Sequence, residues 1–281
     1  MKSMLAVPTV DEVGVHLGVP MEIAKKKGVT FQVFCNEVSK KIMSWANLRL
    51  SQVAKLILIH SILLSMTSHV MRSFKIPKGI AQRIDSLLAK FWWAGNGERG
   101  IHWVNRDIIH LPKGLGGLGV RSIEAVNDAF LFKQAMRIHK NSQLLVSKVI
   151  NSRQGCLVCN SRSITTLSQN SSWGKRSLFQ AVNKFEEGLA WKIGNGCKVK
   201  AISMSWVNGR VPVVKSDQQL VRARDWMVKD FIGANHEWDH CKVRECFEWK
   251  EAKEISAMEQ PRIDKDDYLY WKFHPSGRFS I

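Results

Sequence analysis

One spacing in the sequence is typical of a known binding site. Gly114, Gly116 and Gly119 match the G-x-G-x-x-G pattern of dinucleotide-binding folds. In those folds a buried strand runs directly into the first glycine, so that a helix N-terminus faces a pyrophosphate. Here Pro112-Lys113 intervenes, the segment before it is rich in polar residues, and no acidic residue follows at the expected distance. The pattern therefore predicts a glycine-rich turn ahead of a helix, and no cofactor is expected.

The pair Cys156 and Cys159 has the spacing typical of two zinc ligands. A structural zinc ion needs four converging ligands, so this pair would be half of a site. Two later pairs could supply the other half: His236 with His240, or Cys241 with Cys246. More than seventy residues separate the halves, so two reduced thiols in a polar loop are favoured over a metal site. A thioredoxin-like role would need a surrounding βαβ pattern, which the sequence lacks.

Carboxylates placed for phosphoryl transfer would have to converge from rigid strand ends. Up to Arg224 the chain carries 12 acidic residues, which occur singly except at Asp11-Glu12 and Glu186-Glu187. Asp266-Asp267 lies in the charged stretch IDKDDYLYW without an apolar strand before it, which predicts a solvated turn. No Ser/His/Asp set stands out either. We therefore predict no catalytic residues and expect that the chain is not an enzyme by itself.

The net charge distinguishes this chain, at +18 for 281 residues. Up to Arg224 there are 33 lysines and arginines against 12 acidic residues, and from Asp225 onward there are 9 against 12. Such a basic surface attracts polyanions, so RNA or DNA is the expected partner, held by non-specific backbone contacts. A solvated basic surface without a ligand is the alternative. Charge and position select as candidate contacts Lys25, Lys26, Lys27, Lys40, Lys41, Arg72, Lys75, Lys78, Arg99, Arg106, Lys113 and Arg121.

The cellular setting is indicated by the cysteines and by the absence of a membrane signal. Six cysteines without a dense framework, and no signal peptide, predict reduced thiols inside the cell, in the nucleus or cytoplasm. The most apolar run, Val53–Met66, contains Lys55 and His60 and is too short to span a bilayer. No contact with a membrane is expected.

The elements that must position the basic residues are mostly helices. Apolar residues recur at three- and four-residue steps over 31–45, which predicts an amphipathic helix. A second helix, from Ser51 as its N-cap to about Phe74, is apolar nearly all round and should lie in the core. A third begins near Pro77 and leads into the stretch 91–121, which we interpret as a folded junction.

Further elements follow from the same patterns. The junction contains a short strand candidate, Ile101–Val104, and Ile108–Leu111, which could be a strand or a helical turn. Later helices are expected over 122–140, 142–151, 173–187, 221–231 and 243–258. Asn195-Gly196 predicts a β-hairpin joining Leu189–Ile193 to Cys197–Ile202, and two strands are expected about a turn at His274–Gly277. The fold class predicted is α+β, mainly α-helical.

Consecutive stretches of the chain resemble blocks of plant non-LTR (LINE-type) retrotransposon polyproteins, in the same order and over nearly the whole length. These stretches are HLGVP (His16–Pro20), SWANLRLSQVAKLILIHSIL, SFKIPKGIAQRIDSLLAKFWWAG, IHWVNRDIIHLPKGLGGLGVRSIEAVNDAFLFKQAMRI, WGKRSLFQAVNKFEEGLAWKIGNGCKVKAISMSWV and DYLYWKFHPSGRFSI. In the family these blocks follow the reverse-transcriptase palm, and the last is similar to the run that opens the zinc-binding region.

The resemblance implies a region between the palm and the zinc-binding and ribonuclease H regions. The palm's aspartate motif is missing and the chain stops at Phe279-Ser280-Ile281, so no catalytic residue or metal ligand is carried over. The implied organisation is a thumb- or connection-like helical part over 1–151, a polar linker over 152–172 and a smaller mixed part with β-hairpins over 173–281. The expected function is that of a reverse transcriptase (RNA-directed DNA polymerase) fragment. The alternative is a structural or protein-interaction module from a decayed retroelement.

Overall fold

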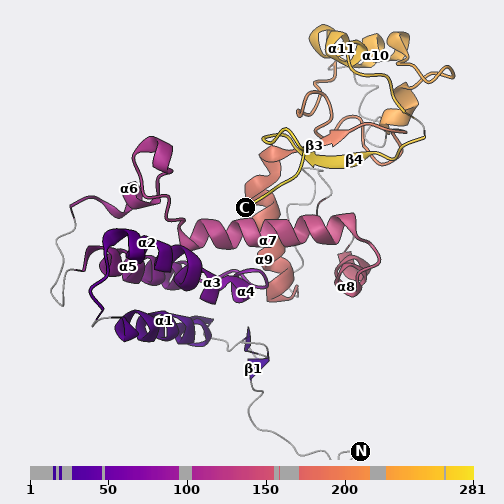
Figure 1. Cartoon of the computed structure of the whole chain (residues 1–281). Helices are drawn as coiled ribbons and strands as arrows, with labels where there is room; N and C mark the ends of the chain where they lie inside the picture. Colours follow the sequence, from indigo (N-terminus) through magenta and orange to yellow (C-terminus); the bar gives the residue numbers. More distant parts are fainter. Residues whose placement is uncertain are drawn as a thin grey trace, which may run out of the picture. The chain divides into compact units, whose positions relative to one another are not determined.

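A computed structural model describes residues 15–16, 19–20, 27–45, 48–94, 103–154, 158, 171–215, 226–262 and 264–281. Over these residues the protein is mainly helical, with two small antiparallel sheets of two strands each (Figure 1). The mainly α-helical α+β class predicted from the sequence is confirmed. The chain divides into two compact units, Met1–Gln134 and Ala135–Ile281, and the division falls inside one helix, α7 (Ile123–Lys140).

The first unit consists of helices and one short strand pair among its described residues. In chain order the elements are β1 (Val15–His16), β2 (Val19–Pro20), α1 (Lys27–Ser44), α2 (Gln52–Leu58), the π-helix η2 (Ile59–Leu63), α3 (Leu64–Met66), α4 (Ser68–Met71), α5 (Lys78–Trp93), α6 (Arg106–His110), the 3-10 helix η3 (Lys113–Leu115) and the first part of α7. Ser51 caps α2 as expected, since its hydroxyl oxygen accepts a hydrogen bond from the Ala54 N–H at 3.2 Å.

The core of the first unit lies where α5 packs against α1 and α2 (Figure 1). The buried side chains of α1 and α5 are those that set the helical period, Phe31, Phe34, Val38, Ile80, Ile84 and Leu88. The segment from α2 to α4 is less buried than expected, because Val53 and Ile57 are 68% and 58% exposed. The expectation that this helix lies in the core holds for one side only, where Ile59, Leu63 and Val70 are buried, because no described element covers the apolar side chains of its outer side.

One buried amide joins three parts of the first unit. Asn127 of α7 is fully buried, and its side-chain oxygen accepts a hydrogen bond from the Ile76 N–H at 2.8 Å. Its amide nitrogen donates to the carbonyl oxygens of Met71 and Phe74 at 2.7 and 2.9 Å. These three bonds satisfy backbone groups in the connection from α4 to α5, which would otherwise be buried without partners. The next residue, Asp128, forms an ion pair with Lys75 of the same connection.

The second unit combines short helices with one sheet. Its described elements are the end of α7, α8 (Leu145–Gln154), α9 (Trp173–Phe185), the 3-10 helix η4 (Glu186–Gly188), β3 (Leu189–Lys192), the 3-10 helix η6 (Val228–Phe231), α10 (His240–Cys246), α11 (Trp249–Ser256) and β4 (Tyr268–Trp271). Its core is aromatic: Trp206 stacks on Trp238 with 5.7 Å between ring centroids, and Phe231 and Phe247 are also buried.

The sheet of the second unit corrects the hairpin prediction. Strand β3 pairs antiparallel with β4, with Lys192 opposite Tyr268 and Leu189 opposite Trp271. The segment 197–202 does not return along β3: Lys200 forms an isolated bridge with Met227, and a turn follows. The hairpin about Asn195-Gly196 is therefore wrong, because a contact distant in sequence replaces the local one.

Several smaller predictions are also corrected. Residues 103–104 are not in a strand, and the turn after β4 leads into no second strand. Of the two alternatives for Ile108–Leu111, the helical turn is confirmed, because Ile108–His110 lies in helix α6. The segment 243–258 is two helices, α10 and α11, and the described part of 221–231 is the single 3-10 turn η6. Most of the segment 152–172 and all of 95–102 lie outside the described residues, so the linker there stays a prediction.

The first unit should depend on Asn127. Replacing it with alanine (Asn127→Ala) leaves one N–H and two carbonyl groups without partners, so we expect a loss of about 3 kcal/mol in the free energy of unfolding. Urea denaturation followed by circular dichroism measures this. Asn141→Ala is the matched control, because Asn141 is exposed and its side chain bonds one carbonyl, that of Arg137. Equal effects of the two substitutions would contradict the assignment.

Candidate nucleic-acid interface

Two acidic side chains of the first unit are buried, whereas most of its described basic side chains are exposed. Asp85 of α5 is buried and accepts a hydrogen bond from the Ile123 N–H at the start of α7 at 3.0 Å. Burial raises the pKa of Asp85, against the lowering effect of that hydrogen bond. Asp128 is also buried and pairs with Lys75. These two carboxylates are therefore used inside the fold, as is the cation of Lys55, which is buried and donates a hydrogen bond to the Ala94 carbonyl oxygen.

The structure places the twelve predicted contact residues in three groups. Lys25, Lys26 and Arg99 lie outside the described residues, and Lys27 begins α1 with its side chain not described. The exposed ones, spread over α1, α4 to α5 and the glycine-rich segment, are Lys40, Lys41, Arg72, Lys78, Lys113 and Arg121. Lys75 and Arg106 make internal contacts instead. Their roles in binding stay predictions.

Lys75 and Arg106, two of the predicted contact residues, connect elements within the first unit. Lys75 pairs with Asp128, and Arg106 donates hydrogen bonds to the Ser86 hydroxyl at 3.0 Å and to the Gln82 carbonyl at 3.4 Å. Both therefore tie neighbouring elements of the first unit together. A basic residue that already has such partners must break those hydrogen bonds or ion pairs to bind a phosphate, whereas one that points into water does not.

Two of the exposed cations rest on aromatic rings. The guanidinium of Arg72 lies 4.9 Å from the centroid of Phe130, and the ammonium of Lys41 lies 5.5 Å from that of Trp45. A ring face attracts a cation and restricts its side chain, so less conformational entropy is lost when a phosphate binds. These cations are held in place while remaining exposed.

Three basic side chains from two segments converge on the first unit. Partial burial lowers the pKa of His60, and the charges of Lys113 and Arg121 lower it further. His60 lies in η2, whereas Lys113 and Arg121 flank the glycine-rich segment. The charges of Lys113 and Arg121 thus both act at His60, and the positive potential that they create there attracts a polyanion.

The glycine-rich segment positions Lys113 and Arg121. It follows helix α6 and begins within the 3-10 turn η3, and no strand leads into Gly114. Gly116 adopts a left-handed conformation with φ of 83°, and a Cβ on Gly117 would come within 2.1 Å of the Leu111 carbonyl oxygen. The glycines thus allow a tight return of the chain, as the turn interpretation predicted, and the strand that a dinucleotide site requires is replaced by helix.

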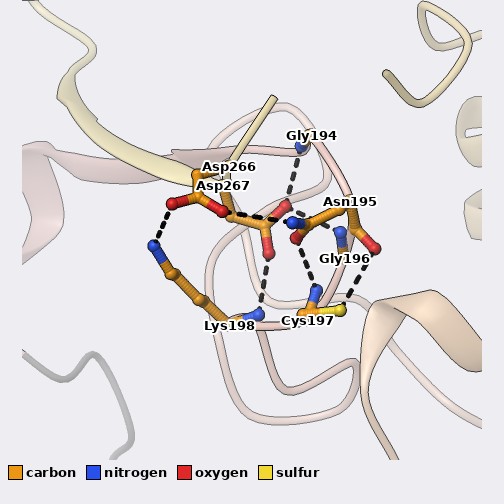
Figure 2. Close-up of polar contacts among 7 residues, drawn as sticks. All are labelled: Gly194, Asn195, Gly196, Cys197, Lys198, Asp266 and Asp267. Carbon is orange, nitrogen blue, oxygen red and sulfur yellow. Dashed lines mark hydrogen bonds and ion pairs between the residues drawn. The ribbon is translucent and has the colours of Figure 1, made fainter. Parts of the chain in front are cut away.

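The sequence reasoning missed a buried carboxylate in the second unit. Figure 2 shows Asp267 surrounded by the loop that follows β3. One oxygen of Asp267 accepts the N–H groups of Gly194 and Gly196 at 2.7 and 2.9 Å, and the other accepts that of Lys198 at 2.8 Å. Asp267 is 4% exposed, so the prediction of a solvated turn is wrong for this residue. The available signal was an acidic residue directly before an apolar strand.

The neighbouring Asp266 behaves as predicted, since it is exposed. Its carboxylate pairs with the Lys198 ammonium at 2.6 Å and accepts a hydrogen bond from the Asn195 amide at 3.2 Å (Figure 2). The hydrogen bond and charge of Lys198 lower the pKa of Asp266. Two adjacent carboxylates therefore have different roles: one is enclosed by backbone N–H groups and the other forms a surface ion pair.

Metal ligands do not gather within the part of the chain that the structure describes, where no group of three or more His, Cys, Asp or Glu side chains could hold an ion. Cys156 and Cys159 lie outside these residues. Cys241 is exposed as a free thiol, and burial raises the pKa of Cys246. The described helices also include none that is long and apolar enough to cross a bilayer.

The contacts of Asp267 predict that a nearly isosteric substitution of this residue lowers the stability of the second unit. Asp267→Asn keeps the shape but turns an N–H group of the new amide toward a backbone N–H, so we expect a loss of about 2 kcal/mol in unfolding free energy. Asp266→Asn, which is exposed, is the matched control and should leave the urea midpoint nearly unchanged. A midpoint unaffected by Asp267→Asn would show that the loop does not depend on this carboxylate.

The cluster of His60, Lys113 and Arg121 predicts a change in titration. Because the two cations lower the pKa of His60, Lys113→Gln together with Arg121→Gln should raise it toward its ordinary value. NMR titration of the imidazole carbon-bound protons measures the shift. Lys40→Gln with Lys78→Gln removes the same charge from other exposed positions and should leave the pKa unchanged. An unshifted pKa in the first double variant would contradict the convergence.

Comparisons with known proteins give two similarities. No protein-family model and no solved structure matches the chain. A protein of Arabidopsis thaliana named "Putative ribonuclease H protein" is 27% identical over 259 residues, which are 90% of this chain and 41% of that protein. An "Uncharacterized mitochondrial protein" of the same plant is 26% identical over 152 residues, 53% of this chain and 97% of that protein. The chain thus spans less than half of the first relative, and both similarities agree with the inferred relationship to plant retrotransposons.

Proposed function

We propose that this chain is part of a plant LINE-type retrotransposon reverse transcriptase, from the region between the palm and the zinc-binding and ribonuclease H regions. In this proposal it holds RNA or DNA by its phosphates and is not a catalyst by itself. The similarity over 90% of the chain to a protein named for ribonuclease H supports the origin, because that module follows this region in such polyproteins.

The observation that carries the binding proposal is the cluster formed by His60, Lys113 and Arg121. Both Lys113 and Arg121 are exposed, and neither forms an ion pair with a described residue. Exposed amines and guanidinium groups bind phosphate oxygens through charge and hydrogen bonds, whatever the base sequence. The proposed contact is therefore with the nucleic-acid backbone and is non-specific.

The carboxylates support a binding role over catalysis. Phosphoryl transfer with metal ions would need acidic side chains that converge and remain free to coordinate. In the described part of the first unit, the buried Asp85 and Asp128 are already occupied by the Ile123 N–H and by Lys75. In the second unit the buried Asp267 is enclosed by three backbone N–H groups. These acidic groups stabilise the fold.

Binding measured against salt concentration tests the proposal. The affinity of the full chain for a labelled duplex should fall at least about tenfold between about 50 and 200 mM salt and should vary little with sequence, because binding releases counterions from the phosphates. Fluorescence anisotropy measures it. Absence of binding at low salt by the folded protein would overturn the proposal and favour a structural or protein-interaction module.

A charge reversal identifies the surface involved. Lys113→Glu with Arg121→Glu should weaken duplex binding at about 50 mM salt by at least about tenfold and should reduce the salt dependence. Lys90→Glu with Lys133→Glu is the matched control: both lysines are exposed in the same unit, and the change in net charge is identical. Equal losses in the two double variants would show that total charge matters and that the cluster does not.

A further inference from the structure

The second unit has a groove of about 1100 Å³ that the proposed contacts do not use, since those contacts lie at or before Arg121. Its lining comes from the end of α7, from β3 and β4, from the loop after β3 and from the turn at 275–278. The volume slightly exceeds the range of ordinary small-molecule pockets, about 300–1,000 Å³. The groove is thus large enough for several linked units of a polymer.

Basic side chains line this groove. Lys140, at the end of α7, and Arg278, after the turn, are exposed and form no ion pair with a described residue. Lys192 and Lys198 also line it, and each has an exposed carboxylate partner at 2.6 Å. Lys140 and Arg278 are therefore the cations of the groove that can bind a polyanion without displacing a carboxylate, and the Asp266 carboxylate, which also lines the groove, stays paired with Lys198.

Aromatic groups accompany these cations. Residues at alternate positions of a strand lie on one face, so Tyr268 and Tyr270 of β4 share a face, and the pairing places Lys192 directly opposite Tyr268 on that face. Tyr268 is 56% exposed and lines the groove. An exposed aromatic ring beside a lysine is the arrangement on which proteins stack an unpaired base while holding the adjacent phosphate.

A buried hydrogen-bond donor lies in the wall of the groove. Trp191 of β3 is 6% exposed, and its ring lies edge-on to His139 with 6.1 Å between centroids. The indole N–H of Trp191 has no hydrogen-bond partner among the described residues. A buried N–H group in a native protein is nearly always paired, so this donor lacks a partner that such groups normally have.

We propose that this groove binds a single strand of RNA or DNA, with Lys140 and Arg278 contacting phosphates and Tyr268 stacking on a base. The inference rests on the proposed function for the class of ligand and adds a second site with a different preference. A duplex keeps its bases paired and cannot offer a free face to Tyr268. An acidic peptide would use the cations but would leave the aromatic face without a partner.

The test uses the full chain with a labelled oligonucleotide of unpaired pyrimidines and with a matched duplex. Lys140→Glu with Arg278→Glu should weaken single-strand binding at least about tenfold and change duplex binding less than about twofold. Tyr268→Ala should weaken single-strand binding about tenfold without altering its salt dependence. Lys229→Glu with Lys250→Glu, two exposed lysines of the same unit outside the groove, is the charge-matched control and should change neither affinity.

Each other outcome overturns the groove proposal in a recognisable way. If the groove variants keep single-strand affinity while Lys113→Glu with Arg121→Glu loses it, the groove is not a site and the proposed function stands. If the folded protein binds neither oligonucleotide, both proposals fail. If polyglutamate of equal charge displaces the single strand as well as unlabelled oligonucleotide does, and Tyr268→Ala has no effect, the groove is a site for acidic peptides.

Discussion

The buried carboxylate of Asp267 is the interaction on which the second unit depends. It binds the N–H groups of Gly194, Gly196 and Lys198, which the loop after β3 would otherwise expose. The bonds bring residues about seventy positions apart together, and β3 pairs with β4 rather than with the segment that follows the loop. The groove lined by Lys192 and Tyr268 exists because these two strands pair.

Buried acidic groups have the same consequence in both units. Asp85 accepts a hydrogen bond from the first N–H of α7, Asp128 forms an ion pair with Lys75, and Asp267 accepts hydrogen bonds from the loop after β3. Each carboxylate thus binds backbone or a cation inside its own unit. The affinity for phosphate that we propose therefore rests on the basic side chains that remain exposed, such as Lys113 and Arg121.

The sequence predicted the helices, because their positions follow from the local spacing of apolar residues. The apolar spacing in α1 and α5 predicted these helices and much of their buried face. Charge selected Lys113 and Arg121 as candidates; the structure shows that both are exposed, and their role in binding stays a prediction. The sequence could not predict partners distant in the chain. The Asn195-Gly196 pattern favours a hairpin locally, but the carboxylate of Asp267 competes for the same N–H groups and prevails. Likewise nothing local distinguished Lys75, which pairs internally, from its exposed neighbour Lys78.

Ultraviolet cross-linking of the full chain to RNA, followed by mass spectrometry of the attached peptides, tests the central claim most directly. The account predicts saturable attachment within the segment 103–121, next to Lys113 and Arg121, that is lost as salt is raised. It also places a second set of attachments at β4, next to Tyr268. Attachment confined to other segments, or none by the folded protein at low salt, would contradict the claim that this chain holds nucleic acid.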